Sequence, residues 1–182
     1  PDLIYLDGNS LGRLPLDSIQ HLKDVIENQW GKKLIGGWNE GWYEKPTSLG
    51  SRLAKLIGAQ PDEVVVCDTT SVNLFKLAAA ALKYQVGKKQ LISDELNFPT
   101  DLYIFQGVID MLDAGHKLDL LRSEDTITIP DIRLKEAISD NTALVALTQV
   151  AFKSAFMYDI DKITSWAHEA GALCLWDLSH SV

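Results

Sequence analysis

The chain has 182 residues, of which 46% are hydrophobic, and its 17 basic and 25 acidic side chains give a formal net charge of −8. This apolar content is enough for a buried core, whereas the acidic balance argues against a nucleic-acid-binding protein, because phosphate backbones require a basic face. No apolar run approaches the roughly 20 residues of a membrane span, so we expect neither a membrane anchor nor a signal peptide.

The N-terminal third is predicted to form a turn, two helices and an irregular segment. Residues 4–6 read as an extended piece entering a glycine-rich loop at residues 7–12. A helix with one apolar face follows Pro15 and is expected to end at Gly31. Residues 34–46, rich in Gly and Trp, favour a packed surface loop, or alternatively a segment that lines a site or a subunit contact.

Residues 47–57 are predicted to form a second helix, ended by Gly58, and strands then alternate with helices. The expected strands are apolar throughout rather than apolar at every second residue, which favours a mainly parallel sheet covered on both faces. The fold class is therefore α/β, a three-layer sandwich. The expected strands span residues 63–67, 90–93, 117–121, 143–148 and 172–177.

The two cysteines, Cys67 and Cys174, lie in these strand-like runs. We expect both to be reduced core residues and the protein to be cytoplasmic, since disulfides are rare in that compartment. The chain begins without Met and stops directly after its most polar segment, so we also expect a fragment of a longer protein.

Polar residues follow four of these elements: Thr69–Ser71, Phe98–Asp101, Thr148 and Asp177–His180. Because parallel strands end at one edge of a sheet, these residues are expected to converge there. Asp177 is the predicted chemical centre. A carboxylate at a strand end can keep a heteroaromatic ring nitrogen protonated, as in enzymes that use pyridoxal 5′-phosphate (PLP); it can equally cap the next turn.

The other two groups also allow two interpretations. Thr69, Thr70 and Ser71 open a helix, where hydroxyls and unpaired N–H groups can hold a phosphate or where one of them simply caps the helix. Phe98 and Asp101 can place a ring and a hydrogen-bond partner beside a flat ligand, or Pro99–Asp101 can be no more than a helix start.

Four motifs together resemble the kynureninase family of fold-type I PLP enzymes, within the aminotransferase class V superfamily. They are Tyr5-Leu6-Asp7-Gly8-Asn9-Ser10-Leu11-Gly12, Thr70-Ser71-Val72-Asn73-Leu74, Phe98-Pro99-Thr100-Asp101 and Asp177-Leu178-Ser179-His180, which occur in the family's order. The resemblance implies a fold-type I large domain, truncated here, at residues 61–182. Residues 1–60 would form an N-terminal segment and helices that flank the site.

The resemblance also implies a role for each matching residue. Asp177 would pair with the pyridinium nitrogen, and His180 would lie close to the cofactor on the substrate side. Phe98 would stack on the ring, while Thr70 and Ser71 would hold the phosphate. The remaining assignments are Asp101 and Thr148 beside the ring substituents, and Asn9 and Ser10 in the loop that closes on the substrate.

The implied reaction is hydrolytic Cβ–Cγ cleavage of L-kynurenine, or of its 3-hydroxy form, to anthranilate or 3-hydroxyanthranilate and L-alanine. That reaction belongs to tryptophan catabolism by the kynurenine pathway and to NAD biosynthesis. The family further implies PLP as cofactor, no metal, a homodimer, and a Schiff-base lysine beyond the end of this chain. The fragment alone would therefore be inactive.

Three other interpretations remain open. A sibling PLP enzyme, such as a cysteine desulfurase or selenocysteine lyase, shares the Asp and the nearby His but not the Asn9–Gly12 and Phe98–Asp101 patterns. A doubly wound nucleotide-binding protein would carry a glycine fingerprint after its first strand, and Cys67–Ser71 contains no glycine. A non-catalytic α/β scaffold or binding module would also fit a truncated chain.

Overall fold

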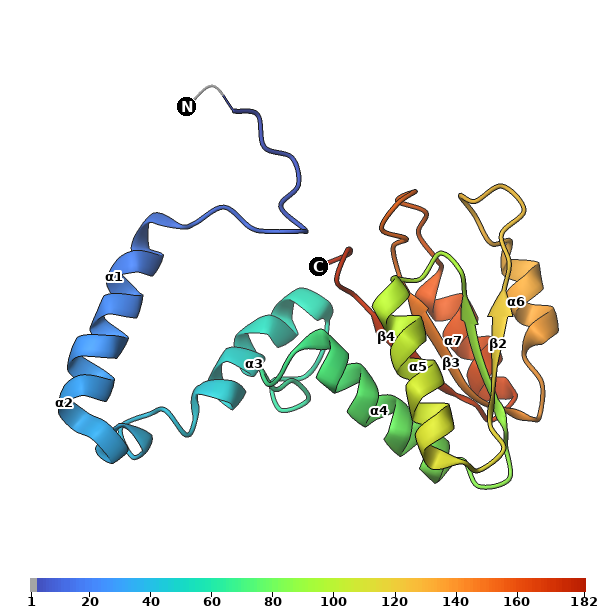
Figure 1. The fold of residues 1–182 in the computed structure, drawn as a ribbon, viewed down its shortest axis with the longest axis horizontal. Helices are drawn as coiled ribbons and strands as arrows, with labels where there is room; N and C mark the ends of the chain where they lie inside the picture. The colour runs from blue at the N-terminus through green and yellow to red at the C-terminus, as the bar shows by residue number, and fades with distance from the viewer. Residues whose placement is uncertain (1–2) are drawn as a thin grey trace. The chain divides into compact units, whose positions relative to one another are not determined.

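The computed structural model describes residues 3–182. These form two compact units, which meet in the sequence between Cys67 and Asp68. The first unit is helical and irregular, and the second contains the whole sheet (Figure 1). Within residues 3–182, no helix is both long enough and apolar enough to cross a membrane.

The first unit begins with one continuous helical stretch. Helix α1 (Leu16–Asp24) continues through a π-helical segment, η1 (Val25–Trp30), into α2 (Gly31–Lys33). The predicted end at Gly31 is wrong, because this glycine keeps a helical φ of −61° and the chain instead leaves the helix at Leu34, where φ is 50°. A 3₁₀ turn, η2 (Leu34–Trp38), follows within the segment expected to be a loop.

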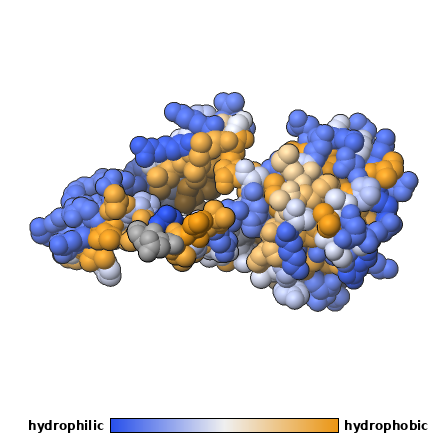
Figure 2. All heavy atoms as spheres, turned by 90° about the horizontal axis from the view of Figure 1, so that it is seen from above, coloured by the Kyte–Doolittle hydropathy of each residue, from blue (hydrophilic) through white to orange (hydrophobic). Residues whose placement is uncertain are grey.

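Helix α3 (Lys45–Ile57) closes the first unit, two residues longer at its start than predicted. It ends where Gly58 adopts the left-handed conformation, with φ of 72°, which costs a glycine little. The apolar face of the earlier helix is exposed: α1 buries no residue, and Ile19, Leu22 and Trp30 are each more than 60% exposed. Figure 2 shows apolar side chains at the surface of this unit among polar ones.

The second unit is built on a parallel sheet, as predicted, which contains four of the five expected strands. Its strands lie in the order β2-β1-β3-β4, and the sheet bounds are β1 (Gln90–Asp94), β2 (Lys117–Leu121), β3 (Thr142–Thr148) and β4 (Leu173–Asp177). The central strand β3 is buried at every residue. This explains why its sequence is continuously apolar rather than alternating.

Helices cover both faces of the sheet, which makes three layers and confirms the α/β prediction. Helices α4 (Thr70–Tyr84) and α5 (Pro99–Leu112) lie on one face, where they pack on Leu91, Leu144 and Ala146. Helices α6 (Asp131–Ala137) and α7 (Ile160–Glu169) pack on the other face, against Ile92, Val145 and Leu147. Successive strand residues thus serve opposite cores, as the pleat requires.

The predicted strand at residues 63–67 is not formed. The Val66 N–H donates to the carbonyl of Pro46 at 3.1 Å, and no ladder joins this segment to a strand of the described chain. Val65 is 57% exposed and Cys67 is also exposed, so the prediction that Cys67 is a core residue is wrong, while Cys174 is half-buried. A β-branched run favours extended backbone, but a strand needs a neighbour to pair with.

The topology reverses between β1 and β3. The chain moves from β1 outward to β2 through α5 on one face, then returns to β3 and continues to β4 through α7 on the other face. In open α/β sheets, the crevice outside the carboxyl ends of the strands at such a reversal is where ligands bind. The ends of β1 and β3, with that of β4 beside them, therefore bound the candidate site.

Candidate functional site

Asp177 is the last residue of β4, and its side chain is nearly buried, with 9% exposed. Its Oδ1 accepts hydrogen bonds from the backbone N–H of Ser179 at 2.9 Å and from the Ser179 hydroxyl at 2.6 Å. The carboxylate therefore does cap the next turn, and both of these bonds end on the same oxygen. Turn capping leaves Oδ2 for another donor, so the two interpretations of Asp177 are compatible.

Thr148 lies opposite Asp177, at the matching position of neighbouring strand β3. Its hydroxyl is buried and donates toward the backbone carbonyls of Val150 at 3.2 Å and Asp177 at 3.4 Å. The N–H of Gln149 also donates to the Asp177 carbonyl, at 2.9 Å. These bonds fix the end of β4 against the end of β3.

Asp101, in the first turn of α5, is the second acid of the site. It is 3% exposed, and its Oδ2 is buried with no hydrogen-bond partner in the described chain. Burial, and then the negative charge of Asp177, raise the pKa of Asp101 to about 7. The structure thus brings Asp101 and Asp177 within electrostatic reach of each other.

Three rings lie in a row at the same edge of the sheet. Phe98, just before α5, contacts Phe152 in an edge-to-face arrangement, with ring centres 4.9 Å apart and an interplanar angle of 66°. The Phe152 ring is in turn 6.4 Å from that of His180. Phe98 is still 39% exposed, so part of its ring is accessible to a ligand.

The loop that presents Phe98 is held by a buried network. Asp94, the last residue of β1, accepts hydrogen bonds from the N–H groups of Leu96 at 2.7 Å and Asn97 at 3.0 Å through Oδ1. The Asn97 side chain donates to the Ser93 hydroxyl at 3.2 Å and accepts the Phe98 N–H at 2.9 Å. Phe98 is therefore positioned by side chains rather than by its helix alone.

The start of α4 supplies the hydroxyl cluster. Thr69 is the N-cap, and its Oγ1 accepts the N–H of Val72 at 3.3 Å, so the capping interpretation holds for this one residue. Thr70 lines a cleft of about 310 Å³ that also reaches Asn73, Asp177 and Ser179. Thr70 and Ser71 are exposed, and Ser71 does not line this cleft in the described part of the chain.

Asn9 and Ser10 lie in the first unit, on an exposed turn. The hydroxyl of Tyr5 donates to the carbonyl of Leu11 at 2.6 Å, which closes this turn. Their role toward the residues of the second unit remains a prediction.

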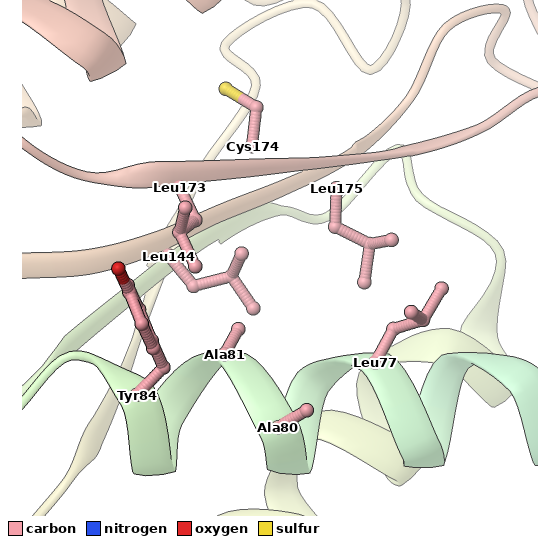
Figure 3. A pocket seen from close by; sticks show the side chains of 8 residues that line it. All are labelled: Leu77, Ala80, Ala81, Tyr84, Leu144, Leu173, Cys174 and Leu175. Carbon is pink, nitrogen blue, oxygen red and sulfur yellow. The ribbon is translucent and has the colours of Figure 1, made fainter. Parts of the chain in front are cut away.

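A second cavity, of about 430 Å³, lies between α4 and the edge strand β4. Figure 3 shows Leu173 and Leu175 pointing from the strand toward Leu77, Ala80 and Ala81 of the helix, while Cys174 points to the opposite side of the strand. Its lining is mostly apolar; Tyr84 contributes a hydroxyl and Cys174 a thiol that points away, so the cavity offers packing surface and is not lined by a carboxylate or an imidazole. The cleft at Asp177, which is lined by a carboxylate and by hydroxyl-bearing side chains, is therefore the better candidate site.

Phe152, Asp94 and Tyr158 were not predicted from the sequence, and Ser179 was named in a motif but given no role of its own. Ser179 could have been found, because a serine two residues after an Asp is a common turn signal. Phe152 lies in a loop without periodicity, so only the folded chain brings it to Phe98. Among residues 3–182 there is no cluster of three or more His, Cys, Asp or Glu side chains that could hold a metal.

Comparison with known proteins gives a consistent family. The family model described as aminotransferase class-V matches residues 4–182. A kynureninase from Pseudomonas fluorescens is 46% identical, and one from Burkholderia mallei (strain SAVP1) is 45% identical, each over 98% of this chain. The chain spans 42% of the length of these relatives.

Solved structures agree in fold at much lower identity. A mutant of C-DES with glycine covalently linked to its PLP cofactor has a TM-score of 0.80 at 12% identity, and the match covers 98% of this chain and 47% of that protein. A NifS-like protein has a TM-score of 0.77 at 15% identity, and this match covers 96% of this chain and 48% of that protein. These matches support the three-layer fold.

Proposed function

The chain belongs to the aminotransferase class-V family, and on that premise we propose that the full-length protein is a PLP-dependent kynureninase. It would hydrolyse the Cβ–Cγ bond of L-kynurenine, or of 3-hydroxykynurenine, to anthranilate or 3-hydroxyanthranilate and L-alanine. The observation that carries this proposal is the 45–46% identity to proteins named kynureninase over 98% of the chain. The neighbours named as a cystine C–S lyase or as cysteine desulfurases are only 12–20% identical.

The residues of the second unit fit PLP. The cleft runs from the start of α4, where free N–H groups favour a phosphate, to the Asp177 carboxylate. The buried Oδ2 of Asp101 has no partner in the described chain, as expected of a group that awaits a ligand atom. When bound, PLP would serve as an electron sink for carbanion chemistry.

Each residue of this chain then has a definite task. Asp177 would hold a proton on the ring nitrogen, because an anion there stabilises the positive charge. Phe98 would lie against the ring, with Phe152 at its edge to fix its orientation. Thr70 and Ser71 would bind the phosphate. Thr148 and Asp101 would lie beside the ring substituents, and His180 on the substrate side.

The first unit would complete the enzyme. We propose that Asn9 and Ser10 contact the substrate and that residues 1–60 flank the site, while residues 61–182 belong to the large PLP-binding domain. A cytoplasmic homodimer is part of the same proposal. It is supported by the exposed apolar side chains of the first helix, including Ile19, Leu22 and Trp30, which a second copy could cover.

The test is fluorescence of anthranilate released by the full-length protein, supplied with PLP and L-kynurenine, with the 3-hydroxy substrate run in parallel. Release of the aromatic acid would establish the reaction and the preferred substrate. A PLP absorbance band without release would instead favour a sibling lyase, which L-cysteine and L-cystine would then reveal. Absence of the band would favour a non-catalytic scaffold.

A further inference from the structure

We infer that Asp101 is held as a neutral carboxylic acid beside the Asp177 carboxylate and donates a hydrogen bond to an acceptor atom of the ligand. This inference rests on the proposed function and deepens it. A ligand that fits the site would then carry two groups on one ring. A cationic N–H would donate to Asp177, and an oxygen atom would accept the hydrogen bond from Asp101. The two acids would have opposite hydrogen-bonding roles, although their side chains are chemically identical.

The environments of the two acids differ in the way that this inference requires. Asp177 receives two donors from Ser179, which stabilise a carboxylate. Asp101 is more deeply buried, at 3% exposed, and its Oδ2 meets no donor in the described chain. An ionised carboxylate without donors is costly to bury, so the proton remains on the acid that has no other compensation.

The position of Asp101 in the first turn of α5 favours the ionised carboxylate and therefore opposes the effect of burial. A helix N-terminus favours a negative charge there, typically by about 0.3–1 kcal/mol. Burial of an unpaired carboxylate costs several kcal/mol, which is larger. Burial therefore decides the protonation state, and the negative charge of Asp177 adds to it.

Among residues 3–182, no positively charged side chain offsets these two effects on the Asp101 carboxyl. Several elements pack near Asp101, and they and the loops after their strands carry titratable groups: Lys76, Lys83 and Tyr84 on α4, Asp94 and Glu95 at the end of β1, Lys117, Asp119, Arg122, Glu124 and Asp125 on and after β2, Lys153 and Tyr158 after β3, and Asp177 and His180 at the end of β4. Lys76 pairs with Asp68, and Asp94 accepts the Tyr158 hydroxyl. Of all these groups, Asp177 is the one that acts on the carboxyl of Asp101.

The first test is a ¹³C NMR titration of the full-length protein without cofactor, labelled at aspartate carboxyls. The resonance that Asp101→Asn removes should titrate near pH 7, and Asp177→Asn should move that midpoint lower because the neighbouring charge is gone. Asp110→Asn, on the same helix with an exposed carboxylate that accepts a hydrogen bond from Gln106, is the matched control and should leave it unchanged. An Asp101 that is already ionised at pH 5 would overturn the inference.

The second test is binding of pyridoxine 5′-phosphate, which carries the ring and phosphate but no aldehyde and therefore binds without a covalent bond. Asparagine keeps an N–H donor at position 101 and cannot ionise. Relative to Asp101→Asn, the wild-type affinity should therefore fall roughly tenfold per pH unit above 7. Comparison of the two proteins with the same ligand cancels the titration of the ligand itself.

The two failures are distinguishable. If pyridoxine 5′-phosphate binds with this pH dependence and kynurenine is not cleaved, the proposed reaction fails and the inference about Asp101 stands. If kynurenine is cleaved but wild type and Asp101→Asn share one pH profile of binding, Asp101 is not a neutral donor, and the proposed reaction stands.

Discussion

Tyr158 donates its phenolic hydrogen bond to Oδ2 of Asp94 at 2.7 Å, and both side chains are buried. This bond joins the loop after β3 to the end of β1, so it ties the segment that carries Phe152 to the turn that carries Phe98. Burial raises the pKa of Asp94, and the three hydrogen bonds that it accepts oppose that rise. The carboxylate is therefore stable in the interior only while its donors remain.

Replacement of Tyr158 by Phe removes one of these donors and leaves Oδ2 of Asp94 buried without a partner. We expect the free energy of unfolding to fall by about 1–3 kcal/mol, the cost of an unsatisfied buried polar group. Urea denaturation measures this directly. Tyr103→Phe, at a position 73% exposed, is the control and should have little effect; equal stability of the two variants would contradict the role of the bond.

Gly50 in α3 lies against the backbone of Val64, and a methyl group there would overlap the Val64 carbonyl oxygen. We expect Gly50→Ala to destabilise the protein by about 1–3 kcal/mol, as is usual when extra atoms are forced into a packed contact. Gly107→Ala in α5 is the matched control, because no atom of residues 3–182 lies within 4 Å of the added methyl. That variant should gain up to about 1 kcal/mol from helix propensity, so thermal unfolding should move in opposite directions for the two.

Under the proposed function, loss of the Asp177 carboxylate should nearly abolish turnover by the full-length protein. We expect Asp177→Ala to lower kcat at least about a hundredfold, the usual effect of removing a group that stabilises developing charge. Ser179→Ala removes only the hydroxyl donor to Oδ1 and keeps the backbone N–H, so its loss should be smaller. A folded Asp177→Ala variant that retains more than about a tenth of the wild-type rate would count against the proposed role.

The raised pKa of Asp101 predicts a pH dependence of stability. Its pKa is about 7 in the folded chain, against an ordinary value of 3.8, so the folded state binds the proton more tightly than the unfolded chain does. The free energy of unfolding should therefore fall as pH rises from about 4 to about 7, and then level. Urea titrations of wild type and Asp101→Asn across that range should show a difference between the two that grows with pH; a constant difference would exclude this linkage.

Much of the second unit could be predicted from its sequence. Strands β3 and β4 are almost continuously apolar, and such runs alternating with helices favour a parallel sheet covered on both faces. The edge strand β2 is not such a run, because it contains Lys117 and Asp119. The convergence of Thr148 and Asp177 follows from the same pattern, because residues at the ends of adjacent parallel strands must meet. The buried face of a helix is harder to predict: in α4 the buried residues include Leu74 and Ala78, while the apolar side chains of Val72 and Phe75 are about 40% exposed.

What the sequence alone determined was local: which segments favour strands or helices, where turns follow them, and which polar side chains stand at strand ends. Only the tertiary structure decided which strands find a neighbour to pair with and which groups surround each buried side chain. Residues 64–67 have the β-branched composition of a strand but form none, because in the described chain no strand pairs with them. Asp101 and Asp177 are both acids at element ends, and only burial and the donors around each side chain make their environments different, because the cost of a charge depends on what surrounds it.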